Sequence, residues 1–354
     1  MYTLILPISG GGFVNQLGIL QHLCEVNFKP DLTLASSGGN VAAYIASAAN
    51  WKWSAIERIS RELSQDLFVK KWSSIPTMAI LIGFFKGNSY NKGNGVKDFL
   101  NKYFTEKTIT NYEIWTGTYN QTHQKCSIFC NRSQDDSIID ASSINHHLVQ
   151  SCPPVYADGN IDLIASVGIA SASIPALVPE EVIDGEHHSD GGVGGSSPIM
   201  QLYEPILEYT QTSETPLHLI YVNSIDLSLN NTKDYLNVMD NWRQATQNVI
   251  KSQMVIDRFI CFQLLKSKGT TIKHVTFKCN YQNLKKLEHF RYFTVGSLLE
   301  IYPEKTENVN LSKFCGNDII KCIRTTYDHC HCRFWWVDIP SHSESIKNII
   351  SSFI

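Results

Sequence analysis

Three short glycine-rich segments hold the residues of this chain whose types and spacing could perform chemistry. Residues 9–12 read Ser-Gly-Gly-Gly, residues 35–39 read Ala-Ser-Ser-Gly-Gly, and residues 190–192 read Asp-Gly-Gly. A serine hydroxyl attacks an ester carbonyl when a nearby base removes its proton, and an aspartate can be that base. Backbone N–H groups that no side chain covers can stabilise the oxyanion that forms. The three segments together predict a serine hydrolase whose base is an aspartate.

Ser37 follows a predicted strand over residues 32–36 and precedes a predicted helix. A strand-to-helix turn exposes the serine hydroxyl and aims the next backbone N–H at the reacting carbonyl, and the helix N-terminus favours negative charge there. The positions two before and two after the serine come close together, and they are the small residues Ala35 and Gly39. We expect Ser37 to be the nucleophile, while an ordinary small-residue turn remains the alternative.

Gly10, Gly11 and Gly12 follow the first predicted strand, over residues 3–7. Three consecutive glycines can point several backbone N–H groups at one position, which would form an oxyanion hole or a phosphate cradle. A nucleotide site is not supported, because the last glycine of G-x-G-x-x-G and a Walker lysine are both missing. We therefore expect no cofactor, and a plain tight turn remains the alternative for this loop.

The segment around Asp190 carries a longer pattern than a simple turn. Residues 170–175 read Ala-Ser-Ala-Ser-Ile-Pro, Val178 and Pro179 follow, and Pro198 lies eight positions after Asp190. In this order, and together with the two serine and glycine segments, the chain resembles the patatin-like acyl hydrolases. Ala35 departs from that family by replacing the first glycine of its G-x-S-x-G turn. Further departures are a glycine loop about two residues shorter, the lack of a basic residue in it, and Ser196 in place of an asparagine.

The resemblance implies a mechanism and a fold. It implies hydrolysis of acyl esters of phospholipids or related lipids by a Ser37–Asp190 dyad, within an α/β/α three-layer sandwich around a mainly parallel sheet. Because aspartate is a weak base at neutral pH, we expect apolar or desolvated surroundings to strengthen Asp190. The resemblance assigns the oxyanion hole to Gly10, Gly11, Gly12 and Gly38, and supporting positions to Ala35, Gly39, Gly191 and Gly192.

Two other functions fit the same residues. A catalytically silent scaffold that binds lipid or a protein partner would explain Ala35, Ser196 and the short glycine loop, although such a scaffold would be expected to lose Ser37 and Asp190 first. An esterase or thioesterase acting on soluble substrates would differ at the mouth of the pocket. The sequence favours the lipid acyl hydrolase.

Histidines and cysteines could suggest a triad or a metal site. His187 and His188 precede Asp190, but only His188 shares its face in a strand. The run 329–332 reads His-Cys-His-Cys, and its adjacent spacing strains tetrahedral coordination, with no second C-x-x-C pair to support it. We expect neither a metal site nor a histidine base.

The chain alternates predicted strands and helices, as parallel sheets covered by helices do. Strands are expected at residues 113–119, 125–130, 217–222 and 274–278, helices at 16–25, 40–49, 162–173 and 235–268, and a hairpin turn at Asp184-Gly185. Ser54 has capping-box spacing before a further helix. The 235–268 helix is expected to bury a stripe of Val249, Val255, Ile256, Phe259, Ile260 and Leu264. We expect one domain over residues 1–345, in which residues 226–345 resemble the family less.

Composition restricts the partners and the location. The formal net charge is -3 over 354 residues, and basic residues are not in excess. We therefore do not expect the protein to bind nucleic acid. The ten scattered cysteines fit a reducing cytoplasm, and we expect neither a secretory signal nor a transmembrane helix. Residues 75–85 are unusually apolar but too short to span a bilayer, so they predict either a buried element or a patch that contacts a membrane transiently. The oligomeric state is not readable from the sequence.

Overall fold

The structure is a computed structural model that describes most of the chain. The described residues are 3–9, 12–63, 70–71, 91–93, 96–104, 111–144, 150–175, 178–212, 215–224, 238–290, 293–306 and 315–339, with residues 346 and 348. Gly10, Gly11 and the apolar segment 75–85 lie outside these ranges. The expectations for those residues therefore stay predictions.

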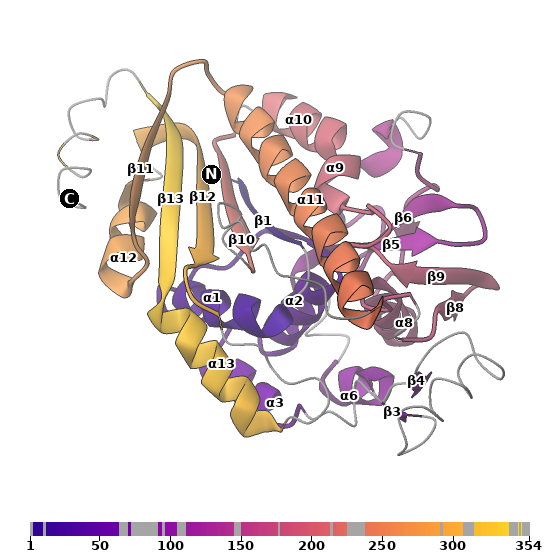
Figure 1. Ribbon diagram of the computed structural model, residues 1–354. Coiled ribbons are helices and arrows are strands. Elements are labelled where there is room, and N and C mark those ends of the chain that lie inside the picture. Colours follow the sequence, from indigo (N-terminus) through magenta and orange to yellow (C-terminus); the bar gives the residue numbers. More distant parts are fainter. Residues whose placement is uncertain are drawn as a thin grey trace.

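A mainly parallel sheet forms the centre of the fold (Figure 1). Its parallel strands lie in the order β12-β10-β1-β2-β5. Their bounds are β12 Thr294–Pro303, β10 Leu217–Asn223, β1 Thr3–Ser9, β2 Leu32–Ser36 and β5 Glu113–Asn120. Because parallel strands end at a common edge, the segments that follow β1, β2 and β10 gather there, at the place where open α/β sheets bind ligands.

Further strands, all paired antiparallel except β7, which runs parallel to β6, extend both edges of this sheet. β13 and β11 follow β12, while β6 and β7 follow β5, and the β8–β9 hairpin joins the sheet by pairing β9 with β5. Their bounds are β13 Cys330–Asp338, β11 Ile272–Lys278, β6 Lys125–Cys130, β7 Val155–Tyr156, β8 Glu181–Ile183 and β9 Glu186–Asp190. A separate pair, β3 Lys70–Lys71 and β4 Asn91–Gly93, lies off the main sheet.

Helices cover both faces of the sheet, because its strands are apolar on both sides. Leu4, Leu6 and Ile8 of β1 pack into one core cluster, and Ile5 packs into the other. The first cluster is covered by α1 Phe13–Glu25, α2 Gly38–Ala48, α3 Trp53–Arg61, α6 Val96–Tyr103, α8 Ile161–Ser171, α12 Tyr281–Phe290 and α13 Gly316–Asp328. The second is covered by η1 Ala141–Ser143, α9 Pro198–Gln201, α10 Tyr203–Thr212 and α11 Val238–Lys266.

Figure 1 shows α9 and α10 on one side of the sheet and α1, α2 and α13 on the other. The predicted α/β/α three-layer sandwich with a mainly parallel sheet is confirmed. The strands that the sequence predicts over residues 32–36 and 125–130 have those bounds in the structure.

Two expectations about helices are wrong. The helix near Ser54 begins at Trp53 and its N-cap residue, Lys52, makes no side-chain capping hydrogen bond, so Ser54 lies inside the helix and forms no capping box. The predicted buried stripe on α11 is mostly exposed: of its six residues only Leu264 is fully buried, and Ile260 is half-buried. The sheet instead packs against a different face, because α11 has apolar residues around most of its circumference. That inner face comprises Ile250, Met254, Asp257, Cys261, Leu264 and Leu265.

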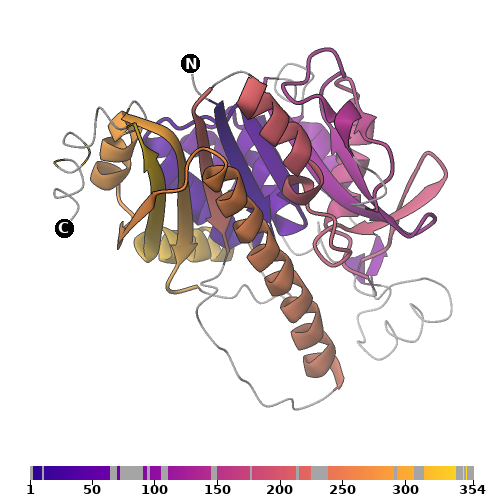
Figure 2. The ribbon, with the colours of Figure 1, turned by 90° about the horizontal axis from the view of Figure 1, so that it is seen from above.

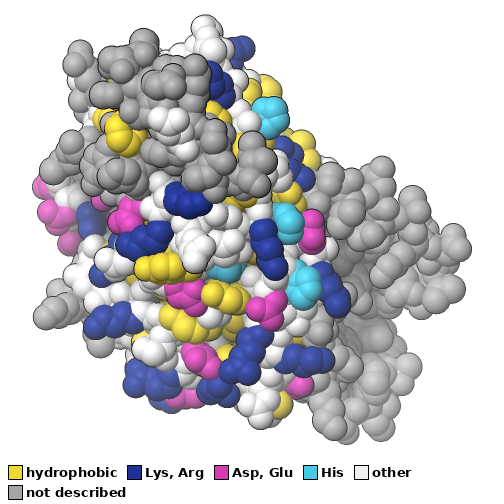
Figure 3. All heavy atoms as spheres, turned by 90° about the vertical axis from the view of Figure 1, so that its left-hand side faces the viewer, with side chains coloured by type: hydrophobic (Ala, Val, Ile, Leu, Met, Phe, Trp, Pro, Cys, Tyr) yellow, Lys and Arg dark blue, Asp and Glu magenta, His cyan; other side chains and the backbone are white. Residues whose placement is uncertain are grey.

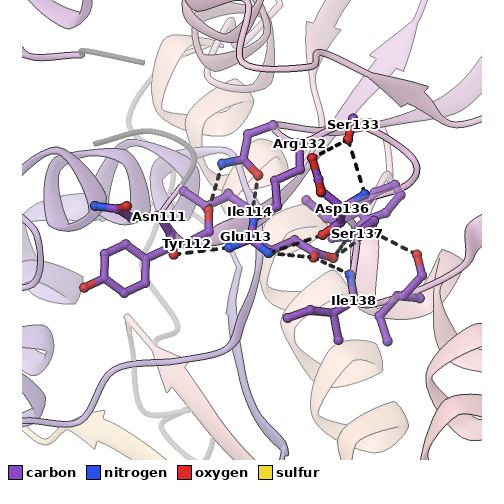
Figure 4. A network of polar contacts seen from close by, with 12 residues as sticks. Asn111, Tyr112, Glu113, Ile114, Arg132, Ser133, Asp136, Ser137 and Ile138 are labelled. Atoms are coloured by element: carbon purple, nitrogen blue, oxygen red, sulfur yellow. Dashed lines mark hydrogen bonds and ion pairs between the residues drawn. The ribbon is translucent and has the colours of Figure 1, made fainter. Parts of the chain in front are cut away.

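A buried carboxylate, Glu113, fixes the loop after β6 to the amino end of β5 (Figure 4). Glu113 accepts hydrogen bonds from Trp115 Nε1 at 2.8 Å, Ser137 Oγ at 3.0 Å and the Ile138 N–H at 2.6 Å. Arg132 adds an ion pair at 3.7 Å. Burial still raises the pKa of Glu113, because desolvation outweighs these contacts. The network lies at the amino end of β5, away from the carboxyl edge of the sheet. It holds the loop after β6 against the sheet and so stabilises the fold.

Candidate active site

Ser37 lies in a one-residue turn between β2 and α2, where the sequence predicts it. β2 ends at Ser36 and α2 begins at Gly38. The Ser37 backbone has φ 53° and ψ −134°, a combination that non-glycine residues rarely adopt. Although Ser37 occupies the N-cap position of α2, its side chain makes no capping hydrogen bond there. The turn therefore holds the hydroxyl free for another partner.

The two small residues that flank this turn have different structural roles. A Cβ atom on Gly39 would lie 2.3 Å from the carbonyl oxygen of Ile8 on β1, so no side chain fits there. The Ala35 methyl group is fully buried in the core cluster beneath α1 and α2. Alanine at the first position is thus accommodated by packing, while glycine at the second is required by the close approach of β1.

Asp190 reaches the turn through strand pairing. Asp184 and Gly185 have φ values of 52° and 83° and join β8 to β9 in a tight hairpin, as predicted. β9 then pairs with β5, where Asp190 lies opposite Thr118. The preceding residue of β5, Gly117, pairs with Ser36 on the same side of β5 as β9, because β6 occupies the other side of the strand. One strand therefore brings the end of β9 next to the turn that contains Ser37.

Ser37 and Asp190 form a direct hydrogen bond. Ser37 Oγ donates to Asp190 Oδ2 at 2.8 Å, and the Val193 N–H donates to Asp190 Oδ1 at 2.8 Å. Asp190 is fully buried and Ser37 is 2% exposed. Burial raises the pKa of Asp190 to about 6, against the smaller opposing effects of its hydrogen bonds from Val193, Ser37 and Gly192. The desolvated environment that the sequence argument requires for a stronger base is thus present.

The glycines after Asp190 let the backbone pass against the neighbouring segments. A Cβ atom on Gly191 would lie 2.1 Å from the Gly117 carbonyl oxygen, and one on Gly192 would lie 3.1 Å from Ser37 Cβ and 3.2 Å from Asp190 Oδ1. A Cβ atom on Gly117 would in turn lie 1.8 Å from the Ser196 carbonyl oxygen. Side chains at Gly191 and Gly117 would force these backbones apart, and one at Gly192 would crowd Ser37 Cβ and the Asp190 carboxylate.

Ser171, at the end of α8, is a supporting residue that the sequence reasoning missed as a functional position. Its Oγ accepts a hydrogen bond from the Ser37 N–H at 3.0 Å and donates one to the Gly117 carbonyl at 2.7 Å. Ser171 is fully buried. In the sequence Ser171 is only one member of the 170–175 pattern. Its contact with Ser37 joins residues 134 positions apart, which no local pattern indicates.

Two of the four expected oxyanion donors can be placed. Gly38 is the first residue of α2, where backbone N–H groups have no partner within the helix, and it is next to Ser37. Gly12 has φ 94°, a left-handed conformation that glycine adopts readily. A Cβ atom on Gly12 would lie 3.3 Å from Ser224 Cβ, which places Gly12 next to the residue that follows β10. Gly10 and Gly11 lie outside the described residues.

Among the described residues, the hydrogen bonds of His187 and His188 go to partners other than Ser37 and Asp190. His188 is 2% exposed, and its Nδ1 shares a hydrogen bond of 2.9 Å with Thr118 Oγ1. Burial lowers the pKa of His188, which favours its neutral form. His187 points to the surface and lies 2.9 Å from Glu180. Within the described part of the chain, Ser37 Oγ is hydrogen-bonded to Asp190 and to no histidine.

The His-Cys-His-Cys run does not converge on one point. Cys330 and Cys332 are fully buried in the core, whereas His329 is exposed and His331 lies 3.2 Å from Glu304. Within the described ranges, no group of three or more His, Cys, Asp or Glu side chains is arranged to hold a metal ion.

The comparison with known families agrees with this arrangement. The family model described as patatin-like phospholipase matches residues 6–203, which is more than half of the chain. The matched segment contains the turn at Ser37, the hairpin and Asp190. A search of curated proteins finds no match to this chain. On the family match and the fold together, the chain belongs to the patatin-like phospholipases, a family of lipid acyl hydrolases.

Proposed function

We propose that this protein hydrolyses acyl esters of phospholipids or related lipids, with Ser37 as nucleophile and Asp190 as general base. The observation that carries the proposal is the buried hydrogen bond of 2.8 Å between Ser37 Oγ and Asp190 Oδ2. It lies at the carboxyl edge of a mainly parallel sheet, in a strained strand-to-helix turn.

The first step is acylation. Ser37 Oγ attacks the ester carbonyl carbon while its proton passes to Asp190 Oδ2, and the carbonyl oxygen becomes an oxyanion. Backbone N–H groups of Gly38 and the Gly10–Gly12 loop would stabilise that oxyanion, a contribution of about 3 kcal/mol for each donor. The intermediate collapses when the bond to the alcohol breaks, and the leaving alkoxide takes the proton from Asp190. The products are the alcohol and an acylated Ser37.

The second step is deacylation. A water molecule attacks the acyl carbonyl and gives its proton to Asp190, and collapse of the second tetrahedral intermediate returns that proton to Ser37 Oγ. The fatty acid leaves and the original hydrogen bond reforms. One carboxylate serves both steps, which is why a pKa near 6 suits it: Asp190 is ionised at neutral pH and is a stronger base than an exposed aspartate.

The test is labelling and turnover of a short-chain chromogenic ester and of phospholipid vesicles by the full chain. Wild type, Ser37→Ala and Asp190→Asn are compared, with Ser36→Ala as a matched control because Ser36 is also a buried serine, one position away. We expect turnover and covalent labelling to fall by at least about a thousandfold in both site variants and to persist in Ser36→Ala. A folded wild type with neither labelling nor turnover would contradict the proposal and support a silent lipid-binding scaffold.

A further inference from the structure

One helix carries most of the large apolar side chains that the described part of the chain exposes to solvent. Six such residues are strongly exposed, and only Val182 and Tyr281 lie elsewhere. The four on α11 are Val249 at 44%, Val255 at 51%, Ile256 at 43% and Phe259 at 60% exposure. Isolated exposed apolar residues are ordinary, but a cluster on one surface marks an interaction site.

Val255, Ile256 and Phe259 are neighbours on one side of the helix, and Val249 lies about two turns earlier on the same side, beyond the exposed Ser252. We call the surface that these four apolar residues mark the outer face of α11. Successive helix residues are about 100° apart, so Val249, Ile256 and Phe259 fall within roughly 80° of one another and Val255 borders Phe259. The opposite side of the helix packs into the core through Met254, Cys261 and other buried residues. Because that inner face already holds α11 on the sheet, the outer face is not needed for packing.

The outer face lies beside the candidate active site. A Cβ atom on Gly195, in the turn that follows Asp190, would lie 3.6 Å from Gln253 Oε1. Gln253 is itself buried and lies at the border between the outer and inner faces, four residues after Val249 and three before Ile256. The Tyr221 hydroxyl, near the carboxyl end of β10, donates to the Met254 carbonyl at 2.9 Å. Figure 2 shows the N-terminal part of α11 extending past the strands. The contacts of Gln253 and Met254 place the helix around Val249 and Ile256 near the edge of the sheet where Ser37 is found.

Basic residues accompany this apolar face. Between Gln244 and Lys266 the only acidic residue is Asp257, and its side chain is buried. Lys251 is half-buried and Lys266 exposed on the same stretch of helix, while Arg258 lies 3.3 Å from Glu300. The sheet edge with β11 and α12 differs, because basic and acidic side chains are interspersed over it (Figure 3). Between Gln244 and Lys266 the charge that α11 presents to solvent is therefore basic, which complements a negatively charged partner.

We infer that the outer face of α11 docks onto an anionic phospholipid surface and holds the active site against it. An apolar stripe accompanied by lysines is the pattern of helices that lie in the plane of a membrane interface. α11 does not cross the bilayer: within the described residues no helix is both long and apolar enough to do so. The inference rests on the proposed function for its purpose, since it explains how an enzyme of this kind would meet a substrate embedded in a lipid layer.

The test separates docking from catalysis by using the full chain in a Ser37→Ala background. Co-sedimentation is measured with vesicles of phosphatidylcholine alone and of phosphatidylcholine mixed with phosphatidylglycerol. We expect binding to the mixed vesicles, and the double variant Ile256→Gln, Phe259→Gln to bind at least about tenfold more weakly. Tyr281→Gln is the matched control, because Tyr281 is 48% exposed on α12, a helix of the opposite layer.

A second measurement ties the face to the reaction. With an otherwise wild-type chain, the double variant should keep turnover of a short-chain soluble ester within about twofold and lose most of its turnover of anionic vesicles. Equal vesicle binding by the double variant and its parent would overturn the inference. The inference would also be overturned if wild type bound no vesicles and sedimentation velocity showed a dimer for wild type and a monomer for the double variant. The outer face would then bind a second copy of the chain. Vesicle binding without turnover in wild type would count against the proposed function alone.

Discussion

The Ser171 hydroxyl accepts a hydrogen bond from the Ser37 N–H at 3.0 Å and so joins the end of α8 to the turn that holds the proposed nucleophile. The same oxygen donates to the Gly117 carbonyl at 2.7 Å, on the strand that also positions Asp190. One buried side chain thus links the three segments whose relative placement defines the dyad. Its effect on activity is exerted through Ser37, so we regard Ser171 as a positioning residue.

Ser171→Ala should lower both stability and turnover. It leaves the buried Ser37 N–H and Gly117 carbonyl without this partner, which costs about 1–3 kcal/mol, and it loosens a turn with an unfavourable backbone conformation. We expect kcat to fall by roughly tenfold or more while KM changes little, as measured with a soluble ester. Ser173→Ala is the control, since Ser173 Oγ donates only to the Ile169 carbonyl. Equal kinetic losses in both variants would show a general structural effect.

The pH dependence of kcat/KM should report Asp190. Because burial raises the pKa of this carboxyl to about 6, the base is protonated and inactive below that pH, and activity should rise through pH 6 to a plateau. The profile is measured on a soluble ester between pH 4 and pH 8. His188→Ala should leave the rising limb in place. If the limb disappeared in that variant, the base would be His188, contrary to the proposed dyad.

Asp190→Asn should stabilise the fold at neutral pH. A carboxyl whose pKa is raised by burial is a cost to the folded state when ionised, so the free energy of unfolding of wild type falls as pH rises from about 4 to 6 and stays lower above 6. A shift of about two pKa units corresponds to about 3 kcal/mol. The measurement is urea unfolding at pH 4 and pH 8. Between these two pH values, the free energy of unfolding of the variant should rise by about 2–3 kcal/mol relative to that of wild type. No pH-dependent difference would mean that the Asp190 pKa is ordinary.

Substitutions at the two flanking positions of the turn should differ in how much stability and turnover they cost. Gly39→Ala places a methyl group 2.3 Å from the Ile8 carbonyl oxygen, so β1 and α2 must separate; we expect a loss of several kcal/mol in stability and most of the turnover. Ala35→Gly restores the glycine usual in the family but removes a buried methyl group, a cost of about 1 kcal/mol. Turnover should then stay within about twofold. Higher activity in Ala35→Gly would show that the methyl group distorts the turn.

Much of this fold and site could be predicted from sequence because the signals are local. The strand before Ser37 is bounded by residues that end strands, and Asp184-Gly185 between short β-prone runs specifies a hairpin by backbone preference alone. The relative order of Ser37 and Asp190 came from the family resemblance, and the structure places their side chains within hydrogen-bonding distance. Their roles in catalysis remain a proposal.

What sequence reasoning missed depends on long-range packing. α11 has apolar residues on two faces, and only the position of the sheet decides that Met254 and Cys261 are buried while Ile256 and Phe259 are exposed. Ser54 has the spacing of a capping box, but the helix starts one residue before it. Ser171 contacts the Ser37 turn, and Gln253 lies close to Gly195. Both contacts join residues far apart in the sequence, so no local pattern indicates them.

The position of β1 in the middle of the sheet has a consequence for the order of folding. β1 lies between β2 and β10 and pairs with β10 from Thr3 and Leu217 onward. Because β10 is late in the sequence, β1 gains this neighbour only after most of the chain has been synthesised. Ser37 is likewise made 153 residues before Asp190, a delay of roughly 10–30 s at ordinary rates of translation. A nascent chain therefore carries the nucleophile without its base. Under the proposed function, the chain can cleave lipid only after β9 has paired with β5, so the order of synthesis delays the onset of an activity that degrades membrane lipids.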